Sequence, residues 1–118
     1  MDMAKLVVSA ASQPKPLREM LRNKEKLVGT DAQFILIPTT AGTGSEATHF
    51  ATVYDGTQKY SVAHQSLLPG WALVDPDLCA SLPASITAST GLDAMCQGIE
   101  SLWAVNSTEA SRAEARAA

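Results

Sequence analysis

The sequence has few cysteines, no excess of basic charge and no long apolar run. Its two cysteines, Cys79 and Cys96, form no Cys-x-x-Cys pair, which excludes a disulfide framework and predicts two reduced, buried thiols. The formal net charge of −3 provides no positive field for a nucleic-acid backbone. No apolar run approaches the roughly 20 residues of a membrane span, and no signal-peptide pattern opens the chain. These absences predict a cytoplasmic protein that binds neither nucleic acid nor membranes.

The composition is that of a globular protein. Hydrophobic residues make up 46% of the 118 residues and charged residues 18%. This length suits one ordinary domain and is short for a two-domain cofactor enzyme. The first predicted helix, residues 3–12, has no clear start, and the last, residues 107–118, has no stop signal. We therefore expect a segment of a longer protein.

Strand and helix patterns both occur along the chain. Residues 34–37 (Phe-Ile-Leu-Ile) and 71–74 (Trp-Ala-Leu-Val) predict two strands, the first covered on both faces and the second also buried. Residues 50–54 and 59–62 flank an Asp-Gly turn and predict a β-hairpin. Together with the helices, these elements predict an α/β fold.

The helical patterns lie at both ends of the chain. Residues 3–12 predict a mostly buried helix, and residues 17–22 a short amphipathic one. From residue 81 onward, with Pro83 in the first turn, apolar residues recur at helical spacing on one face, and Asn106 is the expected N-cap of the last helix. The members of that apolar face are Leu92, Met95, Ile99, Leu102 and Trp103.

A loop of small residues follows the first predicted strand without a spacer. Residues 38–46 read Pro-Thr-Thr-Ala-Gly-Thr-Gly-Ser-Glu. Backbone N–H groups and hydroxyls can approach an anionic ligand here because no bulky side chain intervenes. The loop predicts a site for a phosphate-bearing cofactor, although small-residue turns after strands are common in proteins without one.

Two polar side chains are one helical turn apart in the predicted long helix. Asp93 and Gln97 are spaced i, i+4, so their oxygens can address one ion. A Gln carbonyl binds first-row divalent metals more weakly than an imidazole does. The alternative is that both residues, with Glu100, form the polar stripe of an amphipathic helix.

These motifs resemble the iron-containing (group III) alcohol dehydrogenase family. The family carries a very similar Pro-Thr-Thr-x-Gly-Thr-Gly-Ser-Glu stretch, and a metal-binding Asp followed four residues later by a metal-binding His. This chain has Gln97 at the His position. A branch similar to phosphonoacetaldehyde reductases shares the Gln, the Thr-His-Phe of residues 48–50 and the Asn-Ser-Thr-Glu of residues 106–109.

The resemblance implies roles for particular residues. Asp93 and Gln97 would be metal ligands, for iron or zinc in the intact protein. Asp2 and Lys5 match an Asp-x-x-Lys that follows a glycine loop on the pyrophosphate. The residues matching NAD or NADP contacts are Thr39, Thr40, Thr43, Thr48, Lys59 and Leu78.

Other interpretations stay open for the lysine and the histidines. Lys59 is equally explained as an exposed hairpin lysine. His49 and His64 lack a spaced ligand partner and are interpreted as hydrogen-bonding or surface histidines.

The implied architecture is a partial Rossmann-like dinucleotide-binding sheet with a β-hairpin over residues 1–82, followed by the first helices of an all-α metal-binding domain over 83–118. The implied reaction is hydride transfer between NAD(P) and a small alcohol or aldehyde by a homo-oligomer, with the segment itself inactive. Alternatively, the chain is a non-catalytic, self-associating remnant or a nucleotide-binding module.

Overall fold

The computed structural model describes residues 1–117 of the chain. They divide into two compact units: Met1–Pro38 with Ser45–Val74, and Thr39–Gly44 with the chain from Asp75 onward. The α/β class predicted from the sequence is confirmed, since strands and helices both occur. The predicted division into domains at residues 82 and 83 stays a prediction.

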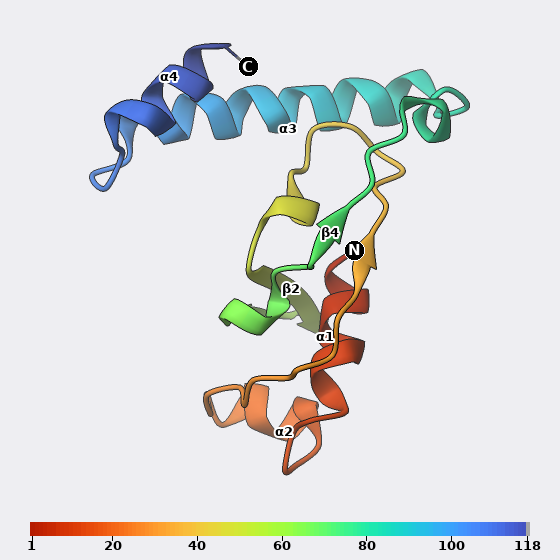
Figure 1. The fold of residues 1–118 in the computed structure, drawn as a ribbon, viewed down its shortest axis with the longest axis vertical. Coiled ribbons are helices and arrows are strands. Elements are labelled where there is room, and N and C mark those ends of the chain that lie inside the picture. The colour runs from red at the N-terminus through yellow and green to blue at the C-terminus, as the bar shows by residue number, and fades with distance from the viewer. Residues whose placement is uncertain (118) are drawn as a thin grey trace. The chain divides into compact units, whose positions relative to one another are not determined.

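The first unit contains two helices and two pairs of strands (Figure 1). The strands β2 and β3 form an antiparallel hairpin, and β1 and β4 pair in parallel. The elements are α1 (Asp2–Ala10), α2 (Leu17–Arg22), β1 (Ile35–Leu36), β2 (Phe50–Asp55), β3 (Gln58–Ala63) and β4 (Trp71–Ala72).

The hairpin forms where the sequence predicted it. Asp55 pairs with Gln58 across the turn, and Gly56 has φ +62°, a conformation that glycine adopts without strain. Helix α2 was also predicted correctly, at Leu17–Arg22.

The parallel pair is more exposed than the sequence predicted. Ile35 pairs with Trp71 and Leu36 with Ala72. Only Leu36 is buried, whereas Ile35 is 57% and Trp71 62% exposed. The prediction that these apolar runs are covered is therefore wrong for the described residues, because Ile35 and Trp71 remain exposed in a ladder of two strands.

The core of the first unit lies between α1 and the hairpin. Leu6, Ala51 and Leu67 are buried there. Partly buried residues packed against them are Leu17, Leu27, Val53 and Val62. Helix α1 buries one face only, since Met3 and Val7 remain exposed. It is amphipathic, and the predicted mostly buried helix over residues 3–12 is wrong in that respect.

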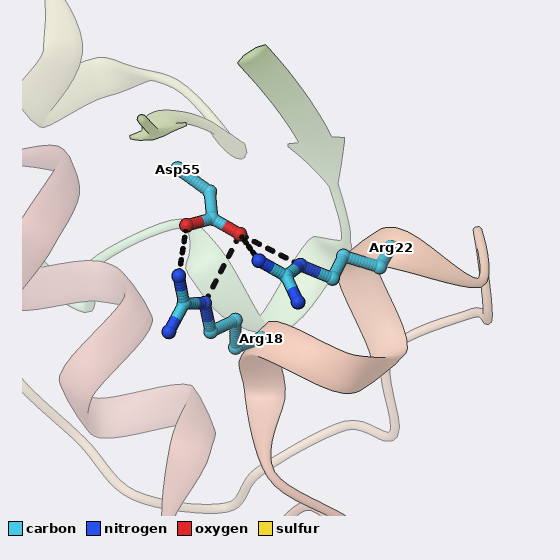
Figure 2. Close-up of polar contacts among 3 residues, drawn as sticks. All are labelled: Arg18, Arg22 and Asp55. Atoms are coloured by element: carbon cyan, nitrogen blue, oxygen red, sulfur yellow. Dashed lines mark hydrogen bonds and ion pairs between the residues drawn. The ribbon is translucent and has the colours of Figure 1, made fainter. Parts of the chain in front are cut away.

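A polar cluster ties α2 to the tip of the hairpin. Arg18 and Arg22 both donate to the carboxylate of Asp55, with Arg22 Nη2 2.7 Å from Oδ2 (Figure 2). The hydrogen bond from Arg18 is the main reason that the pKa of Asp55 falls to about 2. The cluster fixes the hairpin end against the short helix.

The second unit is helical. A 3₁₀ turn (Pro76–Cys79) precedes α3 (Ala84–Trp103), and α4 (Glu109–Ala117) packs against α3 (Figure 1). Pro83 is the N-cap of α3 and not part of its first turn. The cap of α4 is also different from the predicted Asn106, because the Thr108 hydroxyl accepts from Ser111 N at 3.1 Å.

Most of the apolar face of α3 is exposed in the described part of the chain. Leu92, Met95 and Trp103 are 59%, 55% and 79% exposed. Cys79 is half-buried and Cys96 exposed, so the thiols are free as predicted but are not buried. Within residues 1–117 no helix is both long and apolar enough to cross a membrane.

Candidate functional site

The threonine-rich loop packs against α3. Gly42 has φ +101°, and a Cβ placed on it would lie 2.5 Å from the carbonyl oxygen of Thr90 and 3.0 Å from Cβ of Ala94. Only glycine allows this approach. The loop therefore contacts the turn of α3 that carries Asp93.

The loop contains a buried hydroxyl without a partner. In the described part of the chain, two buried side-chain oxygens make no hydrogen bond: Oγ1 of Thr43 and Oε2 of Glu46. Leaving a buried polar atom unpaired costs about 1–3 kcal/mol. Such atoms are satisfied when a ligand supplies the missing partner. Thr39 is exposed and Thr40 half-buried in the same loop.

Asp93 and Gln97 are on one face of α3, as their spacing predicted. The Gln97 Nε2 donates to Asp93 Oδ2 at 2.7 Å, and both side chains are exposed. Among residues 1–117 there is no group of three His, Cys, Asp or Glu side chains that could hold a metal ion. The pair would supply two oxygen ligands at most, so these residues do not complete a metal site.

Lys5 is the most unusual residue of the first unit. Its side chain is fully buried, and its ammonium donates to Thr48 O at 2.7 Å, Phe50 O at 2.9 Å and Thr48 Oγ1 at 3.1 Å. Burial lowers the pKa of Lys5, while the charges of Asp2 and Glu46 raise it. Three accepting oxygens around Nζ are the environment of a protonated lysine.

Asp2 binds the same segment from one turn earlier in α1. Its Oδ1 accepts from Ser45 Oγ and its Oδ2 from Thr52 N, each at 2.8 Å. Asp2 and Lys5 are spaced i, i+3 and so lie on the same face of α1. The two side chains thus contact both ends of residues 45–52.

The remaining site predictions fall in the first unit or at exposed positions. Thr48 is half-buried under Lys5, and Lys59 is exposed on β3. Leu78, in the 3₁₀ turn of the second unit, is 42% exposed. His64 accepts from Ser66 N at 3.1 Å and caps a 3₁₀ turn (Gln65–Leu67), which is the hydrogen-bonding role expected of it.

The predicted site residues are divided between the two units. Thr48 and Lys59 belong to the first, and the other six belong to the second. Sequence reasoning did not predict that Lys5 is buried. The sequence pattern that could have indicated its burial is a single lysine, three residues after Asp2, on the apolar face of a predicted helix.

Comparison with known proteins gives a consistent result. Residues 1–76 match the profile of the family described as iron-containing alcohol dehydrogenase. Long-chain-alcohol dehydrogenase 1 of Geobacillus thermodenitrificans is 46% identical over 77 residues, which are 65% of this chain and 20% of that protein. Phosphonoacetaldehyde reductase of Streptomyces viridochromogenes is 43% identical over 76 residues, 63% of this chain and 19% of that protein.

A solved structure shows the same fold. Sulfoacetaldehyde reductase of Bifidobacterium kashiwanohense, in complex with NAD+, superimposes with a TM-score of 0.81 and 33% identity over 86% of this chain and 28% of that one. The chain thus spans less than a third of the length of each of these proteins. Because the profile covers more than half of it, the chain belongs to the iron-containing alcohol dehydrogenase family.

Proposed function

We propose that the chain provides part of the nicotinamide-dinucleotide site of a metal-dependent alcohol dehydrogenase or aldehyde reductase. The reaction is hydride transfer between NAD(P) and a small alcohol or aldehyde, with phosphonoacetaldehyde as a candidate substrate. The cofactor supplies the hydride chemistry, and this chain contributes hydroxyls and backbone groups that bind and orient it.

The observation that carries the proposal is the close packing of the threonine-rich loop on α3. Gly42 is in contact with the helical turn that contains Asp93, and the Thr43 hydroxyl is buried without a partner among the described residues. A loop that holds an unpaired buried hydroxyl in a fixed position is suited to a ligand that supplies the partner. Support also comes from the NAD+ complex of the sulfoacetaldehyde reductase.

Replacing Thr43 tests the proposal. Thr43→Val keeps the side-chain shape and removes an oxygen that has no hydrogen bond, so the cofactor-free chain should be as stable as wild type or more stable. Binding of NADH, followed by its fluorescence, should nevertheless weaken about 5- to 30-fold if the hydroxyl binds the cofactor, as for a hydrogen bond worth about 1–2 kcal/mol. Thr57→Val, at an exposed position of the hairpin turn, is the matched control.

Equal affinity of the Thr43 and Thr57 variants for NADH would remove Thr43 from the site. Failure of the wild-type chain to bind NADH or NADPH at millimolar concentration would refute the proposed function itself.

Turnover is a separate question. Asp93 and Gln97 provide too few ligands for a catalytic metal within residues 1–117, so we propose that the 118-residue chain alone does not turn over. The test is NAD(P)H-dependent reduction of phosphonoacetaldehyde and butanal with added Fe²⁺ or Zn²⁺. Sustained NADH consumption would contradict this part of the proposal.

A second candidate function, self-association, is favoured by α3. Its apolar side chains at Leu92, Met95 and Trp103 are more than half exposed, and burying them against a second copy would remove apolar surface from water. Sedimentation velocity over a range of concentrations distinguishes the candidates. A monomer at all concentrations would exclude a homo-oligomer formed by this chain.

A further inference from the structure

Lys5 has no hydrogen-bonding capacity left for a ligand. An ammonium has three N–H donors, and all three are used by oxygens of Thr48 and Phe50. The side chain is also completely shielded from solvent. Lys5 therefore cannot donate a hydrogen bond to a bound cofactor, and its contacts can affect cofactor binding only through the residues that it holds.

The Thr48 hydroxyl is fixed by these contacts. It accepts from Lys5 and donates to the carbonyl oxygen of Ser45 at 3.2 Å. Its single proton is therefore used within the protein, and it can offer a ligand only its remaining lone pair. The hydrogen bonds to Lys5 and to Ser45 together fix the rotamer of the Thr48 side chain.

Asp2 completes the arrangement. It accepts from the Ser45 hydroxyl at the start of residues 45–52 and from the Thr52 amide at the end. A single helical turn of α1 therefore holds both ends and the middle of this segment. Because hydrogen bonds to charged groups contribute more than neutral ones, the two side chains stabilise this segment in addition to the pairing of Phe50 to Thr52 with β3.

We propose that Asp2 and Lys5 are positioning residues for dinucleotide binding: they touch no part of the cofactor, and they hold residues 45–52 in the conformation that binds it. This inference rests on the proposed function. It differs from a direct role for the pair, because direct contact would require a free donor on Lys5.

The experiment compares Lys5→Met with Lys26→Met in the full 118-residue chain. Lys26 is an exposed lysine and serves as the matched control. Two quantities are measured: the Kd for NADH by fluorescence, and the hydrogen-exchange rates of the Thr48 and Thr52 amides without cofactor. Lys5→Met removes hydrogen bonds from a charged donor to residues 45–52. If that loss falls on the conformation of this segment that binds the cofactor, NADH binding should weaken about 10- to 100-fold.

The expected result is that Lys5→Met weakens NADH binding and accelerates exchange at both amides, whereas Lys26→Met changes neither. Exchange reports the positioning role separately, because a residue that only touched the cofactor would leave the cofactor-free segment unchanged. Weaker binding with unchanged exchange would overturn the inference, and so would no change in either quantity.

A second variant keeps the test decisive if Lys5→Met loses its helical circular dichroism. Asp2→Asn retains the side-chain shape and removes the charge, and it should weaken NADH binding about 3- to 10-fold with faster exchange at Thr52. Unchanged values for this variant would refute the inference alone. If wild type binds no NADH, the proposed function fails and the cofactor role of the two residues fails with it.

Discussion

Replacing Gly42 with alanine should destabilise the second unit strongly. At φ +101° an alanine is strained by about 1–3 kcal/mol. Its Cβ would also lie 2.5 Å from a backbone oxygen, that of Thr90, which cannot rotate away as a flexible side chain would. Overpacking of this kind costs about 1–3 kcal/mol. The free energy of unfolding should therefore fall by about 2–6 kcal/mol in Gly42→Ala.

A neighbouring glycine separates the clash from the backbone strain. Gly44 also has positive φ, +61°, but a Cβ there would meet nothing within 4 Å. Gly44→Ala should cost only the left-handed strain, about 1–2 kcal/mol. The assay is urea unfolding followed by far-UV circular dichroism, with the α3 amides observed by hydrogen exchange.

The difference in stability between Gly42→Ala and Gly44→Ala tests whether the threonine-rich loop packs on α3. If Gly42→Ala is no less stable than Gly44→Ala, the loop does not pack on α3 as described, and the structural support for the proposed cofactor site is lost.

Three further results are expected. The pKa of Asp55 is about 2 against an ordinary 3.8, so its ion pairs stabilise the fold above about pH 4 and cease to do so as the pH falls towards 2. Acid titration followed by circular dichroism should show this loss of stability in wild type and not in Asp55→Asn. Parallel titration curves for the two proteins would contradict the prediction. Cys96 should react with a maleimide faster than the half-buried Cys79 in the native chain, with equal rates in urea; equal native rates would mean that α3 is covered in solution. Gln97→His should bind Co²⁺ more tightly than wild type, as measured by visible absorption, and adding Asp93→Asn should reverse the gain if the two side chains share the ion.

Local patterns predicted the elements of this chain well. The hairpin around Gly56 and the short helix α2 depend on neighbouring residues, so a sequence window contains the information that determines them. The i, i+4 placement of Asp93 and Gln97 is equally local, and their hydrogen bond follows from it. The threonine-rich loop was predicted from its small residues and from its position directly after a predicted strand.

Burial was predicted less well because it depends on what lies beside an element. Ile35 and Trp71 are apolar and were expected inside, yet they pair in a ladder of two strands with an open face. Lys5 shows the same dependence on distant residues, because three oxygens from remote positions allow a charged side chain to be buried. No window around residue 5 contains Thr48 or Phe50.

The distance along the chain between Lys5 and its acceptors affects how the first unit assembles during synthesis. Thr48 follows Lys5 by 43 residues, so a ribosome adding about 5–20 residues per second makes it roughly 2–9 s later. Over that interval the ammonium must stay hydrated, since its acceptors have not yet been made. Helix α1 can therefore dock only after translation has passed the hairpin's first strand.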